Sequence, residues 1–121
     1  MSSIDMGVVQ ELLDLCDDGD TSLVQELIGI FLDDGPTKIQ AIQQGLRDDD
    51  LEAVERAAHS LKGSSGNLGA NELMETAEAL QNASRNGEVE RSRELGVEIV
   101  ARFDAANAEL RRLLERYASC A

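Results

Sequence analysis

The stretch from Val89 to Tyr117 constrains the fold most, because from Leu95 onward its apolar residues recur at three- and four-residue spacing and no proline interrupts the stretch. This spacing places them on one face of a long helix and does not match the two-residue repeat of a strand. A helix with one apolar face must bury that face against other elements. The stretch therefore favours a fold made of packed helices.

Capping and turn residues divide the rest of the chain into shorter helical segments. Asp5 is expected to cap a first helix, and Thr21 or Ser22 to open a second. The acidic run 48–50 precedes a third helix, and Asn71 is expected to cap a fourth. We predict an all-α fold, an antiparallel four-helix bundle with an additional N-terminal helix.

The second helical segment contains the single proline of the chain, Pro36, directly after Gly35. Two interpretations are open: two short helices with Pro36 in a first turn, or one long kinked helix. The apolar stripe keeps its phase from Phe31 to Ile39 across this point. We therefore expect a single kinked helix.

Size and charge limit the partners of the chain. Its 121 residues suit a single domain spanning residues 1–121. A net charge of −13 argues against nucleic acid and anionic lipid, and no apolar run reaches the length of a membrane span. We expect a monomer in the cytoplasm. Cys16 and Cys120 have no metal-ligand spacing, although a disulfide between them stays open.

His59, the only histidine of the chain, lies in the third helical segment, away from its apolar stripe. At about 100° per residue, His59 is roughly 130° from the centre of that stripe and should be exposed. Lys62 and Gly63 follow at the offsets that adjoin His59 on a helix. The stripe itself consists of Leu51, Val54, Ala58, Leu61, Ser65 and Leu68.

These three residues suit the carriage of a phosphoryl group. A free imidazole titrates near pH 6.5, so much of it is a neutral nucleophile at cellular pH. Lys62 can meet a phosphate oxygen, whereas Gly63, which costs about 1 kcal/mol relative to alanine, leaves room for a second body. The competing interpretation is an ordinary surface histidine. Without a second histidine a zinc site is not expected, and Ser60 points away from His59.

The run 59–65, followed by Leu68-Gly69-Ala70, resembles the signature of histidine-containing phosphotransfer (HPt) domains of two-component phosphorelays. The resemblance implies that His59 accepts a phosphoryl group at Nε2 from an aspartyl phosphate on a receiver domain and passes it to another receiver. It also implies that Lys62 steadies the phosphate and that Gly63 gives the receiver room. Such a chain is a carrier rather than an enzyme.

The resemblance further implies the partners and the secondary site residues. The partners are response-regulator receiver domains and a hybrid histidine kinase, with Mg²⁺ on the receiver and no cofactor on this chain. Gln81 and Arg85, four residues apart, are expected to face the histidine. A docking patch is expected to include Val9, Leu13 and Ser60, unless Val9 and Leu13 belong to the core.

Two other hypotheses remain open at this stage. The first is a four-helix interaction module that binds or sequesters a signalling partner without accepting phosphate. The second is a phosphotransfer piece of a larger hybrid kinase. We expect a free-standing carrier, because no kinase, dimerisation or receiver segment is recognised beside the helical domain.

Overall fold

The computed structural model describes residues 3–15 and 20–119, and every regular element in that part of the chain is a helix. The predicted all-α fold is thereby confirmed. None of the described helices has the length and hydrophobicity needed to cross a lipid bilayer. The helices are α1 Met6–Asp14, α2 Ser22–Arg47, α3 Leu51–Asn67, α4 Asn71–Arg85 and α5 Val89–Ser119.

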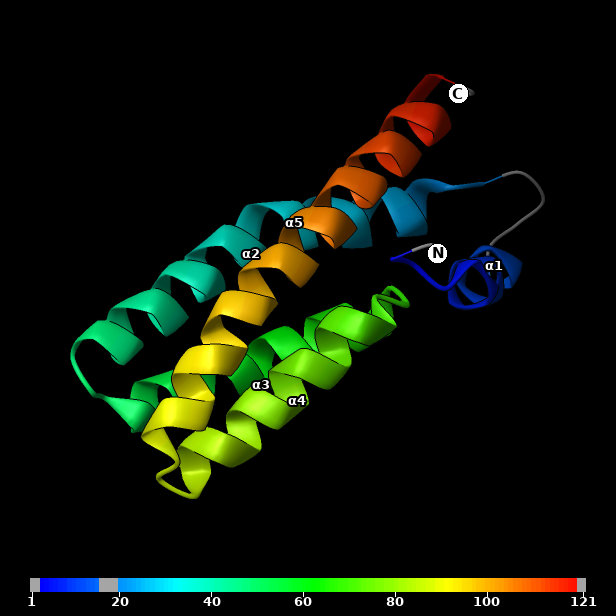
Figure 1. Cartoon of the computed structure of the whole chain (residues 1–121). Coiled ribbons are helices and arrows are strands. Elements are labelled where there is room, and N and C mark those ends of the chain that lie inside the picture. The colour runs from blue at the N-terminus through cyan, green and yellow to red at the C-terminus, as the bar shows by residue number, and fades with distance from the viewer. Residues whose placement is uncertain (1–2, 16–19, 120–121) are drawn as a thin grey trace.

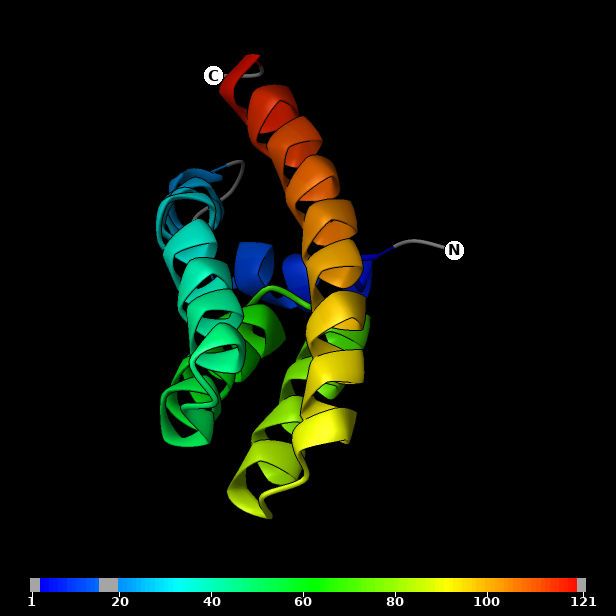
Figure 2. The same cartoon turned by 60° about the vertical axis from the view of Figure 1, so that its left-hand side comes forward.

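Helices α2 to α5 form the bundle, and α1 lies across one end of it (Figures 1 and 2). The connections 48–50, 68–70 and 86–88 are short, so successive helices run antiparallel. Helix α3 packs most extensively against α4, and α2 and α5 complete the bundle on the other side. The far end of α5 extends beyond its neighbours (Figure 1). The predicted bundle with an additional N-terminal helix is confirmed.

Two of the predicted helix caps are present, and one is wrong. The Asp5 carboxylate accepts the Gly7 N–H at 2.9 Å, and the Asp50 carboxylate accepts the Ala53 N–H at 3.1 Å. Asn71 does not cap α4, because the cap position belongs to Ala70 and Asn71 is the first helical residue. The Asn71 side-chain amide instead donates to the Asp5 carboxylate at 3.3 Å and ties α4 to the start of α1.

The Gly35-Pro36 pair lies inside one continuous helix, α2. Gly35 is buried, and a Cβ atom placed on it would lie 2.5 Å from the Phe103 ring of α5. The Phe103 ring also stacks near that of Phe31, with centroids 5.6 Å apart. The glycine therefore allows an aromatic side chain to approach α2 rather than ending the helix, and the prediction of a single helix is confirmed.

The core is built almost entirely from aliphatic side chains, as the scarcity of aromatic residues requires. Val9 is part of this core and is fully buried, so the side chain of Val9 does not belong to an exposed docking patch. Cys16 and Cys120 lie outside the described residues, and the disulfide hypothesis stays open. The largest fully buried side chains are Ile4, Val9, Val24, Ile28, Ile42, Val54, Leu61, Leu68, Leu73, Leu80, Ile99 and Leu110.

Gly69, in the connection between α3 and α4, anchors the N-terminal segment. Its φ of +75° is a conformation that favours glycine, and its carbonyl accepts the Asp5 N–H at 2.7 Å. A Cβ atom at this position would lie 2.7 Å from the Asp5 carbonyl oxygen. Gly69 therefore serves the fold, because it lets α1 pack against the turn that follows the histidine helix.

Candidate functional site

Helix α3 presents His59 to solvent, as its helical position predicts. Val54, Ala58 and Leu61 are buried on the opposite side, whereas His59 is exposed. Ser65 continues the buried stripe because its hydroxyl donates to the Leu61 carbonyl at 2.6 Å, which satisfies a polar group in the core. Packing of α3 thus fixes which way the imidazole faces.

Gln81 of α4 contacts the imidazole directly. Small buried residues on the facing surfaces, such as Ala58 and Ala77, let α3 and α4 pack closely. The Gln81 side-chain Nε2 then lies 3.0 Å from His59 Nδ1, and Gln81 is only 7% exposed. A side chain held this firmly orients the ring of an otherwise exposed histidine.

The contact with Gln81 distinguishes the two ring nitrogens of His59. Nδ1 is engaged inside the protein, and among residues 3–15 and 20–119 Nε2 has no hydrogen-bond partner. A glutamine carries a donor and an acceptor on the same amide group, so rotation of the amide lets it pair with either tautomer. When Nδ1 carries the proton it donates to Gln81 Oε1, and the lone pair of Nε2 is free.

His59 stands in an open hollow of about 440 Å³ between α3 and α4. Arg85, which the family resemblance implied would face the histidine, lines this hollow. The Arg85 Nε–H donates to the Glu55 carboxylate at 2.8 Å, which joins α4 to α3 beside the imidazole. The hollow is lined by Glu52, Glu55, Arg56, His59, Gln81 and Arg85.

Lys62 and Gly63 lie on the same helix, one turn beyond His59. Lys62 is partly exposed, and its Nζ lies 3.8 Å from the carboxylate of Glu78 on α4. A Cβ atom on Gly63 would meet nothing within 4 Å. Nothing in the described part of the molecule therefore requires glycine at position 63, in contrast to Gly69.

The residues predicted for docking have different surroundings. Val9 is buried, Leu13 is partly buried and packs against the core, and Ser60 is exposed beside His59. Sequence reasoning did not predict that Arg85 pairs with Glu55 or that Lys62 pairs with Glu78. Glu55 lies one turn before His59, which was a signal, but a pair that crosses between helices depends on how they pack.

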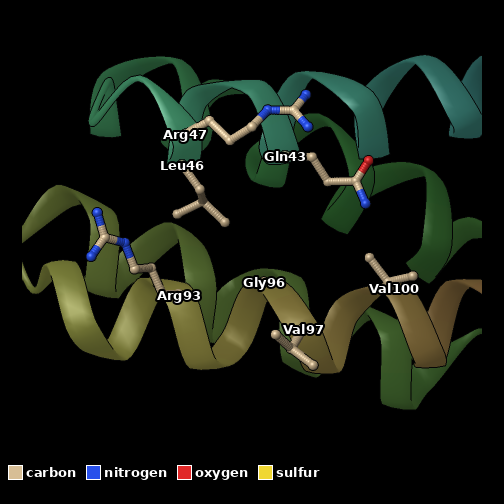
Figure 3. A pocket seen from close by; sticks show the side chains of 7 residues that line it. All are labelled: Gln43, Leu46, Arg47, Arg93, Gly96, Val97 and Val100. Carbon is tan, nitrogen blue, oxygen red and sulfur yellow. The ribbon is translucent and has the colours of Figure 1, made fainter.

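A larger hollow, of about 650 Å³, lies on the opposite edge of the bundle between α2 and α5 (Figure 3). Arg47 and Arg93 project from the two helices on either side of it, and Val97 is well exposed. None of the predicted site residues lines it. Its lining residues are Gln43, Leu46, Arg47, Arg93, Gly96, Val97 and Val100.

The family model of the Hpt domain matches residues 26–119, which include His59 and nearly all of the bundle. The chain belongs to the Hpt domain family. Helix α1 lies outside the matched part of this Hpt domain.

Two further similarities agree with this assignment. The chain is 28% identical over 104 residues to multistep phosphorelay regulator 1 of Schizosaccharomyces pombe, in a match that covers 82% of this chain and 35% of that protein. The chain thus spans about a third of the length of this relative. Its fold matches the crystal structure of histidine-containing phosphotransfer protein B (HptB) from Pseudomonas aeruginosa, with a TM-score of 0.86, 24% identity, and coverage of 95% and 96% of the two chains.

Proposed function

We propose that this Hpt domain is a phosphorelay intermediate that carries a phosphoryl group on His59. The observation that carries the proposal is the arrangement around the imidazole. Nδ1 is held by Gln81 at 3.0 Å, which leaves Nε2 as the nitrogen available to a partner. Lys62 supplies a nearby positive charge, and Gly63 leaves the adjacent surface open.

The proposed transfer needs no proton shuttle within the domain. The lone pair of His59 Nε2 attacks the phosphorus of an aspartyl phosphate on a receiver domain. A nitrogen–phosphorus bond forms, the phosphorus–oxygen bond to the aspartate breaks, and the aspartate leaves as a carboxylate with the bonding electrons. Nδ1 keeps its proton, and once the Gln81 amide has rotated, this N–H forms a hydrogen bond to Gln81 Oε1. The same steps in reverse deliver the phosphoryl group to a second receiver.

The domain contributes alignment and charge to this transfer. Phosphoryl transfer depends chiefly on in-line positioning and on neutralising the charge of the equatorial oxygens. The proposed roles are therefore limited: His59 is the nucleophile, Gln81 orients it, and Lys62 and Arg85 supply positive charge to the bound phosphoryl group. Mg²⁺ and its carboxylate ligands are expected on the receiver. The domain is covalently modified after the first half-reaction and restored by the second, so its proposed role is that of a carrier rather than an enzyme.

The partners that we propose are receiver domains, including one that belongs to a hybrid histidine kinase. The name of the Schizosaccharomyces pombe relative, a multistep phosphorelay regulator, supports a relay role. A single domain over residues 1–121, a monomeric state and a cytoplasmic location remain predictions.

Transfer of radioactive phosphate from a panel of phosphorylated receiver domains tests the proposal. The wild-type protein should gain an acid-labile, base-stable label, and His59→Gln should gain none. His59 is exposed, so the substitution should leave the helical circular dichroism spectrum and the melting temperature nearly unchanged. A folded wild-type protein that takes no label from donors active on a control carrier would favour the alternative, a non-phosphorylated interaction module.

A further inference from the structure

Each of the three cations near His59 is already paired with a carboxylate: Arg56 with Glu52 of the same helix, and the other two with carboxylates of the neighbouring helix. Arg85 of α4 pairs with Glu55 of α3 at 2.8 Å, and Lys62 of α3 pairs with Glu78 of α4 at 3.8 Å. The first pair is the tighter, and it lies in the hollow that contains the imidazole. A phosphoryl group on His59 therefore enters a site in which the guanidinium groups of Arg85 and Arg56 already have anionic partners.

The two members of the Arg85–Glu55 pair differ in their freedom to move. The Glu55 side chain is 28% exposed, whereas that of Arg85 is 56% exposed. An exposed arginine can change its partner at low cost, because its long side chain has many accessible rotamers and water solvates it throughout. Glu55, set deeper and on the same helix as His59, stays near the ring.

A phosphohistidine changes the charge balance of this hollow. The phosphoryl group adds close to two negative charges, which the Glu55 carboxylate repels and the Arg85 guanidinium attracts. A guanidinium binds phosphate oxygens with two parallel N–H donors, as it does a carboxylate. Glu55 and the phosphoryl group thus compete for one guanidinium.

We propose that Glu55 holds Arg85 away from unmodified His59, and that phosphorylation moves Arg85 from Glu55 to the phosphoryl group. Glu55 is then a positioning residue that acts through Arg85. With Glu55 present, the phosphohistidine is less stable than it would be if Arg85 had no competing carboxylate. This keeps the phosphoryl group easy to pass on. The inference rests on the proposed carrier role. In it, Glu55 shifts the equilibrium between phosphorylated and unmodified His59 toward the unmodified form.

The equilibrium is measurable without any receiver. Phosphoramidate phosphorylates imidazole directly, with formation of a nitrogen–phosphorus bond and release of ammonia. ³¹P NMR at a fixed ratio of phosphoramidate to ammonia gives the fraction of phosphohistidine. Glu55→Gln should raise the equilibrium constant about three- to fivefold, the range set by an exposed ion pair of up to about 1 kcal/mol.

A double-mutant cycle separates the effect that Glu55 has through Arg85 from its direct electrostatic repulsion of the phosphoryl group. In an Arg85→Gln background, Glu55→Gln should raise the constant less than in the wild-type background. Glu72→Gln is the matched control, since Glu72 makes a 2.7 Å ion pair between helices with Arg102 and neither residue lines the hollow. This control should leave the constant within about 1.5-fold of wild type.

Two results would overturn the inference. One is an unchanged equilibrium constant in Glu55→Gln, and the other is the same increase with and without Arg85. Because chemical loading bypasses the receiver, these results are independent of whether receivers phosphorylate the domain. Failure of every receiver to label the wild type would instead count against the proposed function.

Discussion

The side-chain amide of Gln81 lies 3.0 Å from His59 Nδ1, so an exposed histidine on α3 is oriented by a buried glutamine on α4. The relationship assigns different tasks to the two ring nitrogens. Nδ1 is the structural nitrogen, and Nε2 is the nucleophile of the proposed transfer. A histidine without such a partner would distribute its proton between both nitrogens and rotate about its side-chain bonds.

Replacing Gln81 with leucine should slow phosphoryl transfer from a receiver about fivefold, because a hydrogen bond worth about 1 kcal/mol no longer fixes the ring. The fold should persist, since leucine has a similar volume at this buried position. Quenched time courses of phosphoryl transfer give the transfer rate, and ¹⁵N chemical shifts of the His59 ring report its tautomer. Unchanged ¹⁵N shifts in the variant would show that Gln81 does not orient the ring.

Replacing Lys62 with alanine should reduce the transfer rate about tenfold, because a cation near the phosphate oxygens is worth on the order of 1 to 2 kcal/mol at a partly exposed site. Lys38 is the other lysine of the chain, so Lys38→Ala is a control with the same change of net charge. The same assay measures both variants. Equal losses in the two would mean that overall charge, rather than the position of Lys62, controls the rate.

Substitutions at Gly63 should separate stability from docking. Gly63→Ala should raise the free energy of unfolding by about 0.5 to 1 kcal/mol, because alanine is the better helix former and its methyl group meets nothing. Gly29, which also has open space around it within a helix, provides a stability control as Gly29→Ala. Denaturant titration measures both.

Gly63→Gln should remain folded but lose at least about tenfold in transfer from a receiver, because its side chain obstructs the surface beside His59. Loading by phosphoramidate, which needs no docking, should be nearly unaffected. Full transfer activity in this variant would mean that the open surface at Gly63 is not used by the partner.

Val9 and Leu13 should respond differently to serine. Val9→Ser should lower the free energy of unfolding by about 2 to 3 kcal/mol, because it removes buried methyl groups and buries a hydroxyl. Leu13 is only partly buried, so Leu13→Ser should stay folded and weaken receiver binding if α1 contributes to docking. Thermal melts and calorimetric titration with a receiver measure the two effects. Normal binding by Leu13→Ser would remove Leu13 from the docking surface.

Local rules predicted much of this fold from sequence. Helical spacing located the helices, and acidic caps such as Asp5 and Asp50 marked where two of them begin. Asn71 was misassigned because only its general preference for cap positions is visible in the sequence. Its side-chain amide instead donates to Asp5, a residue distant in sequence. The burial of Val9 was also undecided, since α1 is short and several of its apolar residues suit either role.

Residue spacing alone could predict the site only along one helix, whereas the expectation that Gln81 and Arg85 face the histidine came from the family resemblance. The exposure of His59 and its adjacency to Lys62 and Gly63 come from the geometry of α3 alone. Contacts from α4, namely those of Gln81, Glu78 and Arg85, depend on the register between two helices. Two glycines illustrate the same limit. Gly63 has open space around it, whereas Gly69 has a crowded position with positive φ, and the residue type alone does not distinguish the two surroundings.

NMR of the ¹⁵N-labelled imidazole shows which ring nitrogen of His59 carries the phosphoryl group. The spectrum is recorded before and after incubation with a phosphorylated receiver and Mg²⁺. We expect a phosphorus coupling on Nε2 and a retained proton on Nδ1. An unmodified ring, or a phosphoryl group bonded to Nδ1, would contradict this expectation.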